Sequence, residues 1–176
     1  MSDNDAVYEF SPDTILVSKT DPRGVITYAN AQFCKAANLS PAALVGKPHA
    51  TVRHPDMPRA AFAMMWAKLQ AAEEFFAVVV NKREGGGCYW VLAHVVPDID
   101  PDSGEVLGFH SSRRWVSPSA RREAERVYAL LRAAEAKAPN KSKAAAAGRA
   151  ALDQLLADAG QTYEQWVMSL AVQTGR

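Results

Sequence analysis

The order of β-branched runs along the first two-thirds of the chain restricts its fold more than any other feature. Runs at 14–18 and 25–29 flank the turn Asp21-Pro22-Arg23-Gly24, which predicts a β-hairpin. Three more runs, at 75–83, 88–96 and 106–116, are separated by a triple glycine and by a polar loop at 98–104. Because hairpins stand at both ends with helical segments between them, we predict an α+β fold with one five-stranded antiparallel sheet.

The segments between the hairpins predict helices that cover one face of this sheet. Asn30 is placed to cap a short helix over 31–37, and Ser40 followed by Pro41 predicts a second short helix that ends before Gly46. Pro58 opens a longer helix over 59–73. Its apolar residues recur at helical spacing and predict a face that lies on the sheet: Phe62, Met65, Trp66 and Leu69.

The composition changes near Ser117, which divides the chain into a domain at 1–117 and a helical C-terminal extension at 118–176. Ser117 and Pro118 predict the start of a helix that ends before Pro139, and a polar joint follows at 140–143. A second helix is predicted over 144–158, and Thr162-x-x-Gln165 is a capping box for a third. The predicted apolar positions of the first and third helices are Val127, Leu130, Leu131, Ala134, Trp166, Val167 and Leu170.

Length, charge and cysteine content exclude several classes of protein. The 176 residues hold one ordinary domain and an appendage, and 20 Lys and Arg against 19 Asp and Glu leave no basic field for nucleic acid. The longest strongly apolar run, at 75–80, is too short to span a membrane, and the acidic start at 1–5 is unlike a signal peptide. We therefore expect a cytoplasmic protein with two free thiols, Cys34 and Cys88.

The segment from His49 to Pro58 concentrates polar side chains immediately before the longer helix. Arg53, His54 and Asp56 lie within four residues between two prolines. One interpretation is structural, with Asp56 capping the helix and pairing with Arg53, and the other is a ligand site. The histidine spacing and the lack of a carboxylate or thiol cluster argue against a metal site. No hydrolase or phosphate-binding motif occurs, so we do not expect an enzyme.

Asn81 follows three valines, which places an amide on a mostly apolar strand where it needs a hydrogen-bond partner. The alternative is an outward-facing residue at the end of a strand. Trp66 and Trp90 are, on residue type alone, more often core residues than platforms for a ligand.

Several strings of residues match the sequences of a known family in both residue type and spacing. These are Thr20-Asp21-x-x-Gly24-x-Ile26-Thr27-Tyr28-x-Asn30, Leu44-x-Gly46-x-Pro48-His49, Val52-Arg53-His54-Pro55-Asp56-Met57-Pro58, Ala61-Phe62-Ala63-x-Met65-Trp66, Asn81-x-Arg83 and Tyr89-Trp90-Val91. The chain from about Val7 to Val116 resembles a PAS domain and is similar to the FAD-binding PAS module of bacterial aerotaxis receptors. It departs from that pattern at Phe75 and at Gly87-Cys88, and a helical tail follows in place of a membrane anchor.

The resemblance implies a sensor of redox or oxygen status in signal transduction that holds FAD non-covalently. It implies that Asn30, Arg53, His54 and Asp56 are needed to hold FAD. Phe62 and Trp66 match the helix face beside the flavin, Asn81 matches an amide near its polar edge, and Trp90 also matches. A flavin suits such a site, because it needs a flat apolar slot with a few convergent polar groups. A signalling partner protein and a homodimer are expected from the same resemblance.

Two other functions stay open at this point. One is a PAS-fold interaction or dimerisation module without a cofactor, and the other is a haem-binding gas sensor with His54, His94 or His110 as the iron ligand. A blue-light receptor is disfavoured, because the segment from His49 to Met57 lacks the cysteine that its chemistry requires.

Overall fold

The computed structural model describes residues 6–174, which form two compact units. Unit 1 comprises the chain up to His54 together with Lys68–Trp115, and unit 2 comprises Pro55–Ala67 together with the chain from Val116 onward. The chain passes from unit 1 to unit 2 between Trp115 and Val116, which is next to the change in composition at Ser117. Residues 55–67 also belong to the unit of the C-terminal helices, and the composition of the sequence did not predict this grouping. The acidic start at 1–5 lies outside the described residues.

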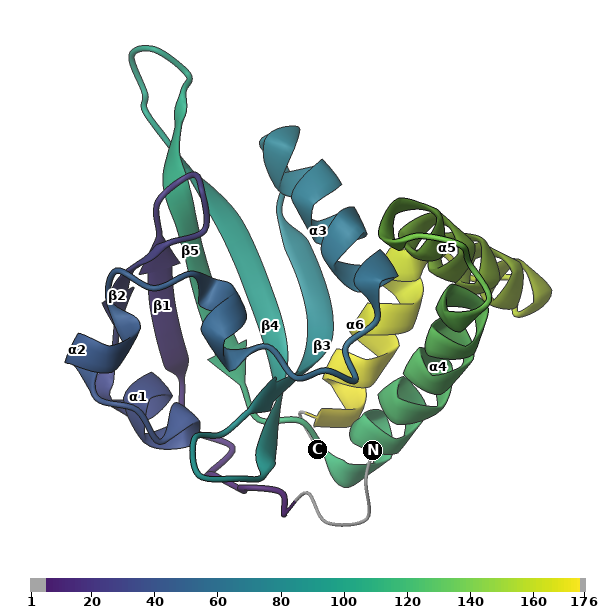
Figure 1. Cartoon of the computed structure of the whole chain (residues 1–176), viewed down its shortest axis with the longest axis horizontal. Coiled ribbons are helices and arrows are strands. Elements are labelled where there is room, and N and C mark those ends of the chain that lie inside the picture. Colours follow the sequence, from purple (N-terminus) through teal and green to yellow (C-terminus); the bar gives the residue numbers. More distant parts are fainter. Residues whose placement is uncertain (1–5, 175–176) are drawn as a thin grey trace. The chain divides into compact units, whose positions relative to one another are not determined.

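Unit 1 contains the predicted sheet, and the prediction of five antiparallel strands is confirmed. The strands lie in the order β2-β1-β5-β4-β3 (Figure 1). The first strand of the chain, β1, therefore pairs with the last, β5, and this pairing joins the two hairpin regions into one sheet. Their bounds are β1 Leu16–Thr20, β2 Ile26–Ala29, β3 Phe75–Lys82, β4 Cys88–Ile99 and β5 Val106–Arg114.

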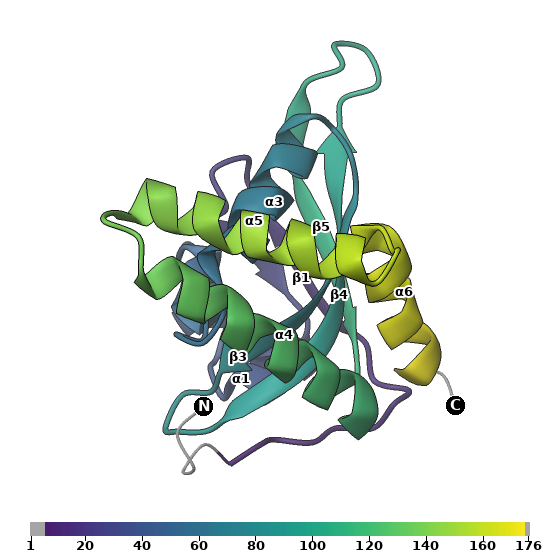
Figure 2. The ribbon, with the colours of Figure 1, turned by 90° about the vertical axis from the view of Figure 1, so that its right-hand side faces the viewer.

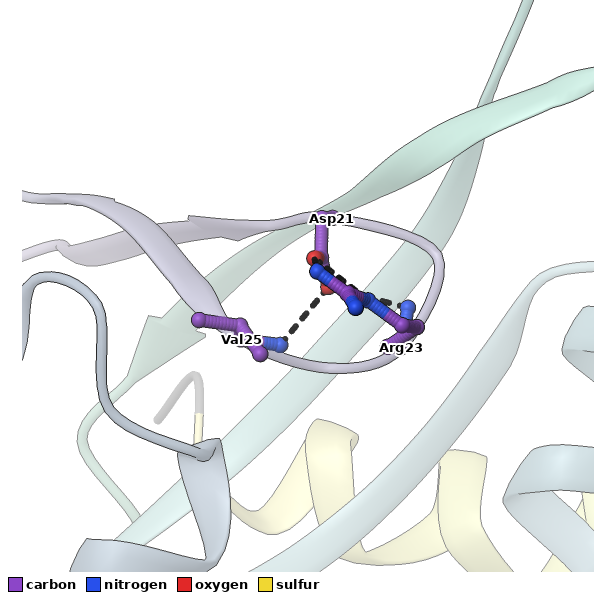
Figure 3. A network of polar contacts seen from close by, with 3 residues as sticks. All are labelled: Asp21, Arg23 and Val25. Carbon is purple, nitrogen blue, oxygen red and sulfur yellow. Dashed lines mark hydrogen bonds and ion pairs between the residues drawn. The ribbon is translucent and has the colours of Figure 1, made fainter.

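The turn between β1 and β2 is held by the side chain of Asp21 (Figure 3). Its Oδ1 accepts hydrogen bonds from the backbone N–H groups of Arg23 and Val25, both at 2.9 Å. Its Oδ2 accepts from the guanidinium of Arg23. These bonds, the one from the Val25 N–H first, hold the pKa of the Asp21 carboxyl below its usual value. Gly24 adopts a φ of 78°, which only glycine tolerates easily, so the turn is fixed locally.

The register of the strands defines two faces of the sheet. Asn81 lies opposite Tyr89 on β3 and β4, and Ala93 lies opposite Arg113 on β4 and β5. Because side chains alternate along a strand, these residues share one face, here called the inner face. It carries Leu16, Ser18, Asn81, Tyr89, Val91, Ala93, Ser111 and Arg113. The outer face carries Lys82, Trp90, His94, His110 and Arg114.

Two short helices and a 3-10 turn cover the inner face. They are α1 Ala31–Ala37, α2 Pro41–Leu44 and η1 His49–Val52, of which α1 and α2 lie beside β1 and β2 (Figure 1). Phe33, Leu44 and Val52 from these segments form one buried core with Tyr89 and Val91 of β4. The side chains of Asn30 and Ser40 cap α1 and α2, which confirms both predicted starts.

Unit 2 is built from helices, and α4 and α5 run side by side in it (Figure 2). The bounds are α4 Pro118–Ala136, α5 Lys141–Asp158 and α6 Tyr163–Thr174. Ser117 caps α4, and the capping box is confirmed, since Thr162 and Gln165 each accept a hydrogen bond from the backbone N–H of the other. Trp166, Val167 and Leu170 are buried as predicted.

Two predictions for unit 2 are wrong. The polar joint at 140–143 is the start of α5, because the side chain of Asn140 accepts from the backbone N–H of Lys143 and caps the helix. Leu130 was expected in the apolar stripe of α4, but it is 49% exposed. The buried stripe of α4 begins earlier and consists of Ala120, Ala124, Val127, Tyr128 and Leu131.

The longer helix, α3 Arg59–Gln70, starts in unit 2 and ends in unit 1. It is shorter than the predicted 59–73, because Ala72 adopts a left-handed φ of 58° and its N–H bonds back to Leu69. Of the predicted stripe, Leu69 is buried, whereas Phe62, Met65 and Trp66 are half-buried. None of the helices within residues 6–174 combines the length and apolar character needed to cross a membrane.

Candidate functional site

Asn81 provides the clearest sign of a ligand site on the inner face of unit 1. Its side chain is 3% exposed, and its Nδ2 has no hydrogen-bond partner among the described residues. The hydroxyl of Tyr89, directly opposite on β4, is also buried and without a partner in this part of the chain. Burial raises the pKa of Tyr89, so this hydroxyl keeps its proton and stays a donor. Unpaired buried donors are costly, and two side by side indicate a place for an acceptor.

Arg53 is brought to Asn81 by the backbone. The two residues form an isolated antiparallel bridge, which ties the segment after η1 to the end of β3. The N–H of Arg53 also bonds to the carbonyl of Ala50 at 3.0 Å, closing η1. His54 follows and is buried. Arg53, His54 and Asn81 are therefore the predicted site residues that unit 1 gathers in one region.

Asn30 has a structural role in the same unit. Its Oδ1 accepts from the backbone N–H groups of Phe33 and Val17, at 2.9 and 3.0 Å, and its Nδ2 donates to the carbonyl of Ile15. One amide therefore joins the start of α1 to strand β1. This positions Phe33 over the inner face.

Trp90 lies apart from Asn81. It neighbours Tyr89 on β4, so its side chain points to the outer face, where it is buried. The strand register therefore does not place Trp90 with the amide of Asn81.

Arg83, which belongs to the motif at 81–83, holds α1 from its C-terminal end. Its Nη1 donates to the carbonyls of Lys35 and Ala36, at 2.7 and 2.8 Å. Its guanidinium also lies 4.1 Å from the centre of the Tyr8 ring. A cation is favourable at a helix C-terminus, where carbonyls lack partners in the helix.

Asp56, Phe62 and Trp66 belong to unit 2. Arg132 of α4 donates to the backbone carbonyl of Asp56 at 2.6 Å, and its Nε lies 4.0 Å from the carboxylate. Phe62 and Trp66 are half-buried on α3. The first N–H groups of that helix, from Arg59 and Ala60, donate to the carboxylate of Glu135 at 3.0 and 2.9 Å. A carboxylate from far along the chain thus serves as a cap at the start of α3.

A second polar group on the inner face escaped the sequence analysis. Arg113 of β5 is 4% exposed and donates to Ser18 Oγ at 3.0 Å and to His49 Nε2 at 2.8 Å. Burial and the charge of Arg113 lower the pKa of His49 to about 3, so its ring is neutral and Nε2 accepts. The pair Arg113-Arg114 was the available signal, because adjacent residues on a strand face opposite sides.

The other histidines and the cysteines give no metal or thiol site in the described chain. His94 lies on the outer face, where it bonds to Glu74 at 2.7 Å and stacks on Phe76. His110 also faces outward. No group of three metal-ligating side chains occurs within residues 6–174. Burial raises the pKa of the Cys34 thiol, which lies in the core on α1.

The inner face thus offers hydrogen-bond donors within an apolar surface. The donors are Asn81, Tyr89 and Arg113, and Val91 and Ala93 lie between them on β4. This combination suits a flat ring with several acceptor atoms.

Comparisons with known proteins place these observations in a family. A family model described as PAS fold matches residues 2–112. The chain is 40% identical over 121 residues to the aerotaxis receptor of Escherichia coli (strain K12), covering 69% of this chain and 24% of the receptor. It is 29% identical over 106 residues to the nitrogen fixation regulatory protein of Klebsiella pneumoniae, covering 60% of this chain and 21% of that protein.

The fold has solved counterparts as well. A light-oxygen-voltage domain studied with a flavin analogue superposes with a TM-score of 0.54 at 20% identity. The superposition covers 70% of this chain and 87% of that domain. At this identity the likeness is one of fold. The chain spans about a quarter of the length of the two curated relatives.

Proposed function

The chain belongs to the PAS family, and on that basis we propose that it is a sensor domain that binds a flavin, specifically FAD. Its fold is the expected PAS fold. The relatives that it resembles are an aerotaxis receptor and a nitrogen fixation regulatory protein. We propose that this domain senses redox or oxygen status and passes the signal to a partner protein.

The observation that carries this proposal is the buried amide of Asn81. Its Nδ2 lacks a partner among the described residues, and it faces the same side of the sheet as the unpaired hydroxyl of Tyr89. The pyrimidine part of a flavin presents carbonyl and ring-nitrogen acceptors along one edge. A flavin there would pair donors whose burial is otherwise costly.

Other residues of unit 1 support the same site in different ways. Arg53, bridged to Asn81 through the backbone, supplies positive charge suited to a phosphate. We propose that Asn30 acts by positioning α1, because its amide joins that helix to β1. Trp90 is expected to act only through the sheet, since it faces outward. The roles of His54, Asp56, Phe62 and Trp66, like the expected homodimer, stay predictions.

A bound flavin would supply reversible electron transfer, and with it a change of charge at the ring. The protein residues supply the fixed surroundings that respond to this change. Asn81 is one such group, because its amide sits near the end of β3, next to the bridge to Arg53. A change in its hydrogen bonding would act on two segments of unit 1 together.

The experiment that tests the proposal measures the flavin-to-protein ratio of the purified 176-residue chain, with chromatography of the released chromophore. We expect a yellow protein that releases FAD. Asn81→Ala should lower retention about tenfold, the effect of losing one buried hydrogen bond to the ligand. Lys82→Ala is the matched control, because Lys82 is the next residue, is exposed and points to the outer face.

The other outcomes point either to a competing function or to a different flavin. Colourless protein that takes up no added FAD or FMN would leave an interaction module without a cofactor. A haem absorption band in place of a flavin spectrum would identify a gas sensor. Release of FMN alone would keep the flavin site and overturn the choice of FAD.

A further inference from the structure

Arg113 occupies an unusual position for a charged side chain. It points from the central strand β5 to the inner face of the sheet, where it is 4% exposed. Its two hydrogen bonds to Ser18 and His49 fix one side of the guanidinium. The ring of Phe33 lies beneath it, with 5.0 Å between Arg113 Cζ and the ring centre. The guanidinium is therefore held in one orientation by three segments of unit 1.

All of these contacts are neutral. Ser18 is uncharged, and the depressed pKa of His49, about 3, leaves the imidazole neutral at neutral pH. Because a guanidinium can only donate, the bond from Arg113 requires that Nε2 of this neutral ring carries no proton. Among the described residues, no carboxylate forms an ion pair with Arg113. Burial lowers the pKa of Arg113 only to about 10, so the side chain stays positive. A buried charge without an opposite charge is costly, which indicates that another group is meant to meet it.

The guanidinium also has hydrogen-bonding capacity to spare. It carries five N–H donors, and the two bonds found in the described chain use two of them. Ser111 precedes Arg113 by two residues on β5 and faces the same side, and its buried Oγ has no partner in this part of the chain. Ser18 lies directly opposite Ser111. Arg113 and Ser111 are therefore a polar centre that lacks an acceptor.

The surroundings favour a ring edge over a phosphate as that acceptor. A pyrophosphate carries two negative charges, whereas this cluster has one positive charge, because His49 is neutral. Leu16 and Ala93 lie directly opposite Arg113 on the two neighbouring strands, and both are buried and apolar. A single cation among apolar side chains suits a flat group whose edge carries acceptors and, at most, one negative charge.

We propose that Arg113, oriented by Ser18 and His49, binds the acceptor-bearing pyrimidine part of the flavin ring, an inference that rests on the proposed function. Reduction of the ring by two electrons and one proton leaves one negative charge on that part. The electrons come from an external donor, which is dithionite in the test below. Arg113 therefore holds the reduced ring more tightly than the oxidised ring, and this preference sets how readily the domain is reduced.

Binding of three ligands to the flavin-free 176-residue chain tests the contact. Riboflavin contains the ring without phosphate, FMN has one phosphate, and FAD has two. We expect Arg113→Met to weaken the binding of all three by the same factor, about 10- to 100-fold, as for a charge-assisted hydrogen bond. The control Arg114→Met removes the adjacent exposed arginine on the outer face and should change none of them.

Reduction adds a second measurement with a variant that preserves the local hydrogen bonds. Arg113→Gln keeps side-chain N–H donors and removes the charge. It should retain more oxidised flavin than Arg113→Met but lose about tenfold of the preference for dithionite-reduced flavin. It also replaces Arg113→Met in all binding measurements if that variant fails to fold.

The thermal stability of the flavin-free variants separates ligand binding from a role in the scaffold. Because Arg113 has no anionic partner in the described chain, its neutral variants should melt at the same or a higher temperature than the wild type. Lower melting together with unchanged flavin affinity would make Arg113 a scaffold residue and overturn the inference. Weaker binding of FMN and FAD with unchanged riboflavin would also overturn it, in favour of a phosphate contact. Wild-type protein that binds none of the three overturns the proposed function itself.

Discussion

Arginine side chains are buried or half-buried in both units, and the two units accommodate them differently. In unit 2, Arg132 donates to the carbonyl of Asp56 and lies near its carboxylate. Glu135, one turn further along α4, accepts from two N–H groups at the start of α3. In unit 1, the side-chain hydrogen bonds of Arg113 within the described chain go to the neutral side chains of Ser18 and His49.

On the proposed function, this difference separates a scaffold from a binding surface. The two N–H groups at the start of α3 have their acceptor, Glu135, in the same unit, so this cap forms by folding alone. The inner face of unit 1 keeps donors that have no acceptor in the described chain. We therefore expect substitutions at the cap of α3 to change stability at any flavin concentration. Substitutions on the inner face should mainly change how much a ligand stabilises the protein.

The largest effect is expected from Glu135→Ala, which removes the acceptor of two N–H groups at the start of α3. Loss of this charged cap should lower the free energy of unfolding by about 2 kcal/mol. Denaturant unfolding of the flavin-free protein measures it. Glu135→Gln keeps a side-chain oxygen as acceptor and should lose less. Equal stability of the wild type and Glu135→Ala would show that α3 does not depend on this cap.

A somewhat smaller effect is expected at Gly148 of α5, which lies against the same cap. An added Cβ there would lie 2.5 Å from Glu135 Oε1 and 3.0 Å from Ala60 Cβ. Alanine is favoured over glycine in a helix by about 1 kcal/mol, but displacing the pinned carboxylate costs more, so Gly148→Ala should destabilise by about 1–2 kcal/mol. In the Glu135→Ala background this loss should shrink. If the losses of stability in the double variant were simply additive, the cost of Gly148→Ala would not come from its clash with Glu135.

The helix starts were predictable from sequence because each depends on residues that are close in the chain. Asn30, Ser40 and Ser117 each cap the helix that directly follows, and the two members of the capping box, Thr162 and Gln165, are only three positions apart. The cap of α3 was not predictable in this way, since its acceptor lies on α4. Asn140 is a local cap that the sequence analysis nevertheless missed. The polar residues that follow it were interpreted as a joint between two helices, whereas they form the first turn of α5.

The residues of the candidate site show the same difference between local and long-range determinants. Asn81 was found because an amide after three valines stands out in the sequence, and the structure leaves its Nδ2 unpaired in the described chain. Arg113 was missed, because its importance depends on which face of β5 it occupies and on contacts to β1 and η1. The strand register that decides the face is set by long-range pairing. The same register places Trp90 away from Asn81.

The acid side of the stability profile tests whether His49 is neutral beside Arg113. The folded protein binds this proton only near pH 3, whereas the unfolded chain binds it below about 6.5, so stability is lost as pH falls through that window. At pH 5.5 the loss from this group should be about 1 kcal/mol. His49→Gln keeps an acceptor for Arg113 and should lose less stability between pH 7 and 5.5. Identical profiles for the two proteins would mean that His49 titrates normally.

The smallest effect is expected from an exposed ion pair of unit 2, which sets the scale for the charged cap of α3. Arg149 Nε lies 2.7 Å from Asp153 Oδ1 one turn along α5, and both side chains are about half exposed. Such pairs contribute little, because water screens them and ordering two long side chains costs entropy. Arg149→Ala should therefore change the free energy of unfolding by only about 0.3–0.5 kcal/mol, measured by the same denaturant unfolding. If Arg149→Ala lost as much stability as Glu135→Ala, the removal of a charged side chain would explain both losses, and the hydrogen bonds of Glu135 to the start of α3 would not be needed to explain its effect.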